Sequence, residues 1–166
     1  MIRKATIADI RALHKFLVDA SKEGEILPRS LNELYHYVRD YFIYRPRKNS
    51  PIEGAAGLHI CWEELAEIRN LYVKKEIRGK GIGEDLVSIC LEEAKALGVG
   101  KVFALTYRKG FFTRLGFHEY EKSNLPNKVW VDCLQCMKFP DCDEEAVIFD
   151  LGKDKFKRIK KPSKKY

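Results

Sequence analysis

Apolar and polar residues follow one another along this chain in patterns that predict a mixed α/β domain. Apolar residues recur three and four positions apart over residues 7–21 and 82–97, which is typical of amphipathic helices. A further helix over residues 30–41 is indicated because Ser30-Leu31-Asn32-Glu33 has the S-x-x-E form of a capping box. Shorter apolar runs predict a short helix at 111–115 and strands at 2–5, 42–44, 57–63, 66–73, 101–106 and 146–151.

The chain has 166 residues, which is room for a single domain of this kind, expected over residues 1–151. Its 45% hydrophobic and 33% charged residues exclude a disordered protein. We expect no membrane segment, since no apolar run approaches the roughly 18–20 residues that span a bilayer. Asp9 interrupts the stretch in which a secretion signal would have its apolar core. Five cysteines, an odd number, predict reduced thiols, so the expected location is the cytoplasm.

The net charge of +7 is confined to the C-terminus. Residues 152–166 hold eight lysines and arginines and one acidic residue, so residues 1–151 are formally neutral. Because like charges repel one another and stay solvated, we expect residues 152–166 to be a disordered basic tail. The neutral body excludes a basic nucleic-acid-binding domain, and contact with nucleic acid or an anionic surface is expected only through the tail.

The densest local signal is a glycine-rich loop between a predicted strand and a predicted helix, with the sequence Arg78-Gly79-Lys80-Gly81-Ile82-Gly83. Glycines allow a tight turn, and successive backbone N–H groups at a helix N-terminus bind anions. The loop has neither the spacing of a dinucleotide fingerprint nor the Gly-Lys-Ser/Thr end of a P-loop. It predicts either a phosphate or pyrophosphate site of another type, or a turn that only caps the helix.

In its context this loop resembles the acetyl-CoA motif of the GNAT superfamily of N-acetyltransferases, a strand followed by R-x-x-G-x-G and a helix, here residues 68–83. Residues 111–117 are similar to the family's second motif, a short helix that ends in Gly-Phe. The resemblance covers most of residues 1–151. It implies a central, mostly antiparallel sheet with one parallel pair splayed at the acetyl-CoA site, flanked by helices. Acetyl-CoA would be the cosubstrate, and no metal would be required.

The same resemblance implies roles for individual residues. The backbone amides of residues 78–83 would hold the CoA pyrophosphate, and the strand from Leu71 to Val73 would pair with the pantetheine arm, with Phe112 of the second motif in the same cofactor site. Glu67 resembles the family's general base, which takes the proton of the attacking amine. The amide of Leu71 would stabilise the tetrahedral oxyanion.

The leaving thiolate needs a hydrogen-bond donor, and here the chain departs from the common family pattern. Many relatives have a tyrosine where Phe112 stands. Thr106 or Tyr107 could replace it, since a threonine hydroxyl can donate to a thiolate and a tyrosine can protonate one. Because neighbours on a strand point to opposite faces, at most one of the two is expected to act.

The acceptor side resembles bacterial N-acetylglutamate synthases in residues 23–38, 66–68, 105–108 and 125–128. The implied acceptor is the α-amino group of a free amino acid, with glutamate as the expected one, in arginine biosynthesis. Arg29, next to Ser30, suits the α-carboxylate by a bidentate fork, and Arg108 and Lys128 suit a second carboxylate. The chain is too short for the arginine-sensing, kinase-like domain of the long synthases, and a homodimer stays open.

Other functions remain open from the sequence: acetylation of another small amine or of a protein N-terminus, or a non-catalytic acyl-CoA-binding module or nucleic-acid-tethered regulator. A metal site is a separate question. Cys133 and Cys136 form a C-x-x-C pair near Cys142, and His118 could be a fourth ligand. No second C-x-x-C follows, so reduced loop cysteines are expected, with a metal or a redox disulfide as the alternative.

Overall fold

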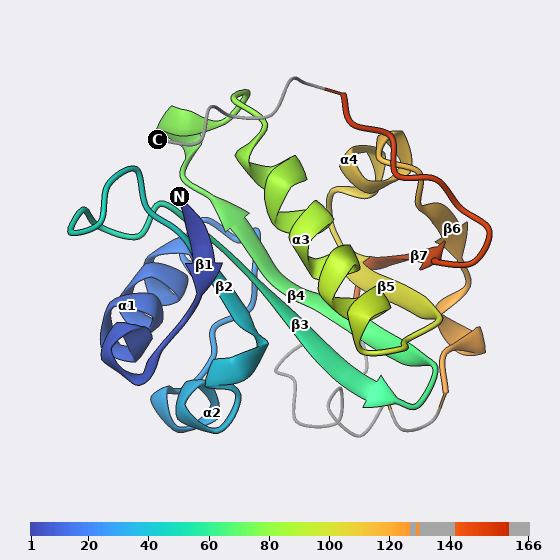
Figure 1. Cartoon of the computed structure of the whole chain (residues 1–166), viewed down its shortest axis with the longest axis horizontal. Helices are drawn as coiled ribbons and strands as arrows, with labels where there is room; N and C mark the ends of the chain where they lie inside the picture. Colours follow the sequence, from blue (N-terminus) through green and yellow to red (C-terminus); the bar gives the residue numbers. More distant parts are fainter. Residues whose placement is uncertain (127–128, 130–141, 160–166) are drawn as a thin grey trace.

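The computed structural model describes residues 1–126, 129 and 142–159, which form one seven-stranded sheet with helices on both faces (Figure 1). Neighbouring strands are antiparallel except for one parallel pair, β4 and β5. The order across the sheet is β1-β2-β3-β4-β5-β7-β6. The strands are β1 (Ile2–Lys4), β2 (Tyr41–Tyr44), β3 (Gly54–Trp62), β4 (Leu65–Val73), β5 (Lys101–Thr106), β6 (His118–Tyr120) and β7 (Glu145–Asp150).

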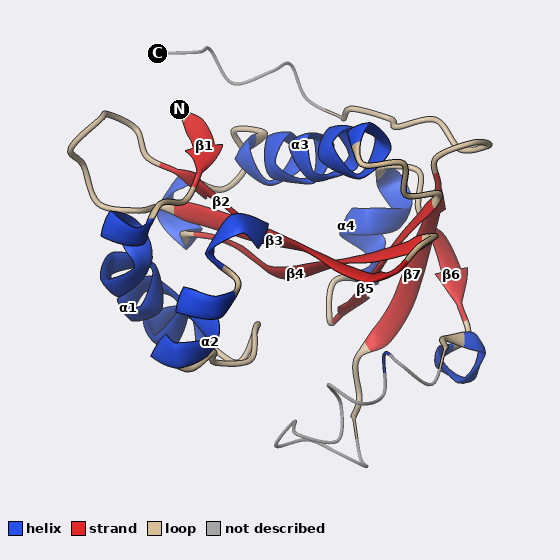
Figure 2. Ribbon diagram, turned by 60° about the horizontal axis from the view of Figure 1, so that its bottom comes forward, coloured by secondary structure: helices blue, strands red, loops and turns tan. Residues whose placement is uncertain are grey.

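The helices cover the two faces of the sheet separately (Figure 2). On one face α3 (Ile82–Ala96) and α4 (Lys109–Arg114) pack over the larger core cluster. On the other face α1 (Ile10–Ser21) and α2 (Leu31–His36) enclose a second core cluster. Single 3₁₀ turns lie at Ile7–Asp9, Val38–Asp40, Lys75–Ile77 and Lys122–Asn124. This is the mixed α/β arrangement that the sequence predicts.

Most element boundaries lie within three residues of the sequence prediction, and three differences have a structural reason. The second helix ends at His36 rather than near residue 41, because Tyr37 leaves the helical conformation and a 3₁₀ turn at Val38–Asp40 leads into β2. β3 begins at Gly54, three residues early, where the small residue fits against α3: a Cβ there would lie 3.3 Å from Leu86. β6 was not predicted, since its three residues have no apolar pattern and form a strand only by pairing with β7.

The register between β3 and β4 shifts near the start of β3, opposite the second half of β4. Ala55 pairs with Tyr72, whereas Gly57 pairs with Arg69, so β4 has one residue more than β3 over this stretch. Asn70 accommodates the extra residue with a left-handed φ of 50°. This is a β-bulge, which bends its strand, and asparagine is among the few residues that adopt such a φ readily.

β4 and β5 pair only at one end. The parallel ladder joins residues 65–67 to residues 101–103, and in the described chain it ends before the bulge. The two strands therefore diverge towards their carboxyl ends, as the GNAT resemblance implies.

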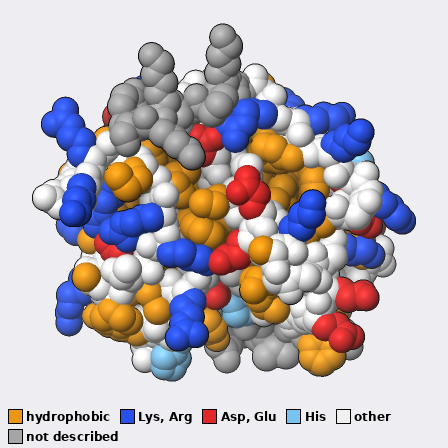
Figure 3. Space-filling model, viewed as in Figure 1, with side chains coloured by type: hydrophobic (Ala, Val, Ile, Leu, Met, Phe, Trp, Pro, Cys, Tyr) orange, Lys and Arg blue, Asp and Glu red, His pale blue; other side chains and the backbone are white. Residues whose placement is uncertain are grey.

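Residues 152–159 lie against the domain, whereas the sequence predicted a disordered tail from residue 152 onward. Phe156 packs against the core cluster under α3 and α4, which offsets the tendency of a basic segment to stay solvated. Elsewhere, acidic and basic side chains are both present on the face seen in Figure 3, in keeping with the neutral body. Among the described residues, none of the helices has the length and apolar character needed to cross a membrane.

Asp9 ties the N-terminal strand to the start of α1. Its nearly buried carboxylate accepts a bidentate pair of hydrogen bonds from Arg3 at 2.7 and 2.9 Å. The backbone N–H and hydroxyl of Thr6 donate to it at 2.9 Å, and Arg45 lies at 3.3 Å. The Arg3 hydrogen bonds, with those of Thr6, hold the pKa of Asp9 far below its usual range, although burial acts in the opposite direction.

Asp9→Asn should lower the free energy of unfolding at pH 7 by about 2–3 kcal/mol, because it removes a charge that accepts several hydrogen bonds. The pKa of Asp9 is lowered by folding, so its stabilisation is complete above the unfolded pKa of about 4 and is lost as the pH falls further. The difference in the free energy of unfolding between the wild type and Asp9→Asn, measured by urea unfolding, should shrink progressively below pH 4. Asp19→Asn, at an exposed site on α1, is the control and should change stability little. A gap independent of pH would contradict this account.

Candidate active site

A cavity of about 770 Å³ occupies the gap between the diverging ends of β4 and β5. The loop 25–29 ahead of α2, the glycine loop 78–83 and α4 also surround it. A hollow of this size with converging polar groups is the usual form of a ligand site. Most residues singled out from the sequence line it: Arg29, Glu67, Leu71, Val73, Arg78, Gly79, Gly81, Ile82, Gly83, Thr106, Arg108 and Phe112.

Four other candidates have different positions, and Tyr107 is described below with Thr106. Lys80 is exposed and does not line the cavity. Ser30 caps α2 through the capping box seen in the sequence: its hydroxyl accepts from the N–H of Glu33 at 3.1 Å, and the Glu33 carboxylate accepts from the N–H of Ser30 at 3.0 Å. Lys128 lies outside the described residues.

The glycine loop presents backbone N–H groups to one end of the cavity. Gly79 and Gly81 adopt left-handed φ values of 84° and 86°, which side chains strongly disfavour. Gly81 is the N-cap of α3, and the N–H groups of the first helical turn have no partner within the helix. Left-handed glycines followed by a helix N-terminus form a cradle that suits a diphosphate.

The side chain of Arg78 braces this loop instead of pointing freely into solvent. Its Nε donates to the carbonyl of Val73 at 2.8 Å, and its guanidinium lies 5.2 Å from the ring centre of Tyr72. The loop is thereby fixed to the end of β4, so the N–H groups around Gly81 are held in place before any ligand binds.

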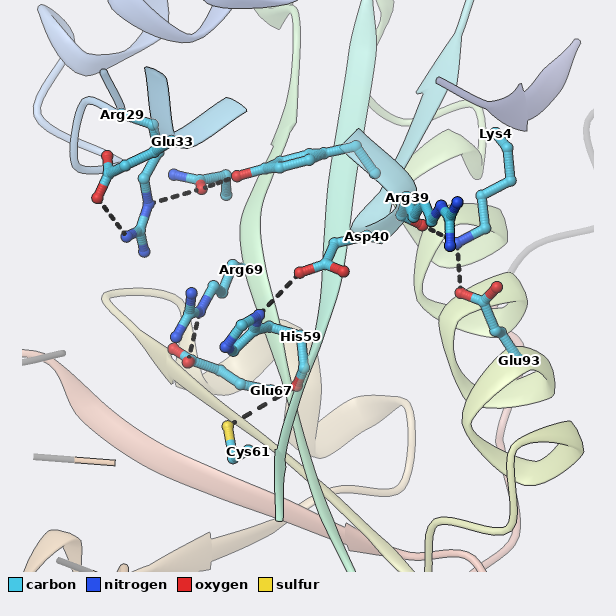
Figure 4. Close-up of polar contacts among 12 residues, drawn as sticks. Lys4, Arg29, Glu33, Arg39, Asp40, His59, Cys61, Glu67, Arg69 and Glu93 are labelled. Carbon is cyan, nitrogen blue, oxygen red and sulfur yellow. Dashed lines mark hydrogen bonds and ion pairs between the residues drawn. The ribbon is translucent and has the colours of Figure 1, made fainter. Parts of the chain in front are cut away.

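Glu67 lies on the same face of β4 as Arg69, two residues further along. The Nε of Arg69 donates to its Oε2 at 2.7 Å, and both side chains are nearly buried. His59 stands directly opposite Glu67 on β3 and is hydrogen-bonded to Asp40 at 2.8 Å (Figure 4). The carboxylate is thus held in one orientation at the wall of the cavity, which Leu71 also lines.

Thr106 and Tyr107 do point to different surroundings. Thr106 lines the cavity, and its hydroxyl accepts from the N–H of Arg108 at 2.8 Å. Tyr107 does not line the cavity, and its hydroxyl donates to Asp143 at 2.6 Å. Phe112 is buried and packs edge-on against its aromatic neighbours, so it forms an apolar wall.

Arg29 reaches the cavity from the loop ahead of α2. Its Nε donates to the side-chain oxygen of Asn70 at 3.2 Å, which also accepts from the hydroxyl of Tyr41 at 2.9 Å (Figure 4). The amide group of Asn70 donates to the carbonyl of Leu27 at 3.0 Å. The bulge residue therefore fixes both the backbone of this loop and the stem of its arginine.

Arg108 is already engaged by a carboxylate of the protein. Glu25 accepts from Arg108 at 2.9 Å and from both terminal nitrogens of Arg78, at 3.1 and 2.8 Å. Burial would raise the pKa of Glu25, but these hydrogen bonds prevail and lower it, so the carboxylate stays charged. Glu25 consequently joins the loop ahead of α2 to both diverging strands.

Sequence reasoning missed Glu25 and Asn70 as parts of the site. The only signal for Asn70 was its type, since a lone asparagine inside an apolar strand is suited to a left-handed bulge. Glu25 lay within the segment that resembles the synthases, but its partners are 53 and 83 residues away in the sequence.

The described part of the chain contains no cluster of residues that could hold a metal. Cys142 is free, and the ring of His118 is hydrogen-bonded to Asp154 at 2.7 Å. Cys133 and Cys136 lie outside the described residues, so the C-x-x-C question is not addressed by this geometry.

Comparison with known proteins agrees with this arrangement. Residues 10–117 match the model of the acetyltransferase (GNAT) family. An uncharacterized N-acetyltransferase of Chlorobaculum tepidum is 38% identical over 151 residues, which cover 89% of this chain and 94% of that protein. An amino-acid acetyltransferase of Mycobacterium tuberculosis is 31% identical, over 94% of this chain and 83% of its own length.

Solved structures show the same fold. The Mycobacterium tuberculosis protein Rv2747, in complex with CoA, has a TM-score of 0.74 at 27% identity, over 90% of this chain and 98% of that one. N-acetylglutamate synthase from Neisseria gonorrhoeae, complexed with coenzyme A and N-acetyl-glutamate, has a TM-score of 0.80 at 22% identity. That match covers 91% of this chain and 35% of the synthase. Coenzyme A therefore binds to neighbours of this chain whose sheet has the same form.

Gly81→Val should weaken CoA binding at least tenfold, about 1.4 kcal/mol, because the side chain disfavours the left-handed turn and blocks the N–H cradle. Titration calorimetry measures the dissociation constant directly. Gly98→Val is the matched control: Gly98 has a φ of 82° at the other end of α3, with nothing within 4 Å of a Cβ. In both variants the side chain at a left-handed φ lowers the free energy of unfolding by a similar amount, roughly 1–2 kcal/mol. Equal CoA affinity in the two variants would refute the loop assignment.

Proposed function

This chain belongs to the GNAT family of acetyltransferases. On that premise we propose that it transfers the acetyl group of acetyl-CoA to the α-amino group of a free amino acid. The first candidate for this amino acid is L-glutamate. The observation that carries the proposal is the shared cavity in which a fixed carboxylate, a bulged strand, a glycine loop and Arg29 meet. A reaction between acetyl-CoA and glutamate fits the cytoplasmic location expected from the sequence, and it would open arginine biosynthesis.

Glu67 is the proposed general base. The amine nitrogen forms a bond to the carbonyl carbon of the thioester, the carbon–sulfur bond breaks, and one proton leaves the nitrogen. Glu67 accepts that proton, directly or through one water, because its carboxylate lines the cavity. The hydrogen bond from Arg69 supports this role by fixing the orientation of the carboxylate.

The bulge in β4 supports the role of Leu71 as donor to the oxyanion. β4 no longer pairs with β5 at this point, so backbone groups on that side of Leu71 are open to a ligand between the two strands. A fixed amide aimed at the developing negative charge stabilises the transition state more than the ground state. The N–H groups of residues 79–83 then serve the diphosphate at the other end of the cavity.

Thr106 is the better candidate for the donor to the leaving thiolate. Its hydroxyl lines the cavity, whereas the hydroxyl of Tyr107 is directed to Asp143. A threonine hydroxyl donates a hydrogen bond but does not protonate a thiolate at neutral pH. The thiolate would therefore leave as an anion stabilised by Thr106 and take its proton from solvent.

Arg29 is the proposed partner of the acceptor's α-carboxylate. Arg29 lines the cavity, and its Nε is already fixed by Asn70. Its Nη1 lies 3.9 Å from Glu33, so a bidentate substrate carboxylate would bind Nη2 and share Nη1 with Glu33. Arg108 would meet the side-chain carboxylate of glutamate, together with Lys128 if that residue reaches the site. Because Glu25 also binds Arg108, the substrate carboxylate would have to share this guanidinium.

The Glu25–Arg108 ion pair favours a second candidate acceptor, an amino acid with an uncharged polar side chain such as glutamine. An amide group could accept from Arg108 without competing as an anion with Glu25. Glutamate and glutamine must therefore be compared directly.

Glu67→Gln should lower kcat roughly 100-fold at pH 7, since the amide keeps the shape of the side chain but cannot accept a proton. The deficit should shrink as the pH rises, because more of the amine is then already deprotonated. Thiol release is followed from pH 6 to 10 at saturating acetyl-CoA. Glu64→Gln, on the exposed turn before β4, is the control. A variant with the pH–rate profile of the wild type would move the base to another residue.

Arg29→Lys should raise KM for the amino acid about tenfold or more and leave the affinity for acetyl-CoA nearly unchanged. The charge is kept while the bidentate geometry is lost, and a hydrogen bond to a charged group is worth about 1.5–3 kcal/mol. The assay compares glutamate, glutamine, aspartate and a short peptide. Arg11→Lys, exposed on α1, is the matched control. If the peptide is the best acceptor, the amino-acid proposal fails while acetyl transfer as such remains.

A further inference from the structure

Residues 152–159, here called the C-terminal strap, run from the end of β7 past α4 towards the N-terminal end of α3 (Figure 1). Asp154 fixes the beginning of the strap. Its carboxylate accepts from the N–H of Asp150 at 2.8 Å and from the ring of His118 at 2.7 Å. Burial would raise the pKa of Asp154, but these two contacts prevail and keep it lowered.

The middle of the strap fits closely over the turn that ends α4. A Cβ on Gly116 would lie 2.5 Å from the carbonyl oxygen of Lys155, so only glycine leaves room for the strap. The N–H of Lys157 donates to the carbonyl of Leu115 at 2.9 Å, and Phe156 packs into the core. The strap therefore has a defined path over the second GNAT motif.

The strap ends at the first turn of α3, beside the glycine loop. Arg158 forms an ion pair with Asp85, and the N–H of Ile159 donates to Glu84 at 3.1 Å. Ile159 lines the cavity together with Glu84, while 45% of its surface is exposed. An apolar side chain left at the edge of a ligand cavity is positioned to be covered by the ligand.

The two carboxylates that the strap binds are unfavourable neighbours for a diphosphate. Glu84 and Asp85 lie in the first turn of α3, where the helix N-terminus attracts anions. A carboxylate close to that position repels a bound phosphate by Coulomb interaction. Arg158 neutralises one of these charges, and the N–H of Ile159 binds the other.

We propose that the C-terminal strap is part of the acetyl-CoA site: Arg158 and the Ile159 N–H offset the charges of Asp85 and Glu84, and the Ile159 side chain forms a wall at the phosphate end. The strap belongs to this site in addition to the glycine loop. The inference rests on the use of acetyl-CoA and not on which amine accepts the acetyl group.

Arg158→Gln should raise the dissociation constant of CoA about fivefold, or ~1 kcal/mol, because the charge of Asp85 is then no longer offset. Calorimetry with CoA alone measures it, so that no acceptor or turnover is involved. Lys157→Gln removes the same charge from the neighbouring, exposed position and should change the dissociation constant less than twofold. The difference between the two variants should shrink in 0.5 M salt, because salt screens exposed charges.

The decisive variant is Arg158→Gln combined with Asp85→Asn. If Arg158 acts by neutralising Asp85, removing the carboxylate should restore CoA affinity to within twofold of the wild type, while Asp85→Asn alone should not weaken binding. Failure of the double variant to recover CoA affinity would overturn the proposal, as would equal effects of Arg158→Gln and Lys157→Gln. If glutamate is not acetylated but the double variant recovers its CoA affinity, only the proposed acceptor is refuted.

Discussion

Asn70 bends β4 in the middle of a seven-stranded sheet, because its left-handed φ accommodates one residue more than β3 can pair. The bulge lies in the part of β4 that no longer pairs with β5, where the cavity separates the two strands. The same side chain fixes Leu27 and Arg29 on the far side of that gap. One residue thus shapes the strand that borders the cavity and holds in place the loop on its far side.

Ion pairs, rather than apolar packing, connect the parts of the site that the bend separates. Glu25 joins Arg78, on the glycine loop, to Arg108, after β5. Two residues earlier, Glu23 accepts from the hydroxyl of Tyr72 at 2.6 Å and pairs with a lysine of the next loop. Burial and Glu23 raise the pKa of Tyr72 to about 12, so its hydroxyl remains a donor at any pH relevant to the reaction. The loop ahead of α2 is therefore fixed by charge to both strands that border the cavity.

Periodicity predicted the long elements well, because their own residues determine them. Helix α3 and strand β5 lie within one residue of their predicted ends, and the capping box at Ser30 starts α2. Features that depend on a distant partner could not be predicted from the local apolar pattern. β6 forms a strand only by pairing with β7, and the ion pairs of Glu25 join residues more than fifty positions apart. The bulge at Asn70 is a single backbone angle, which leaves no trace in an apolar pattern.

The composition of the basic C-terminus does not predict the contacts that its described first half makes with the domain. Eight positive charges in fifteen residues predict a solvated segment, yet two apolar residues, Phe156 and Ile159, lie among the charges of its first half. Burying one large apolar side chain is worth about 1.5–3 kcal/mol. The described first half brings one of these charges, that of Arg158, to the first turn of α3, the helix whose N-terminus faces the cavity. If the glycine loop holds the diphosphate of acetyl-CoA, as proposed, Arg158 lies beside that diphosphate, and its charge has a role at the active site.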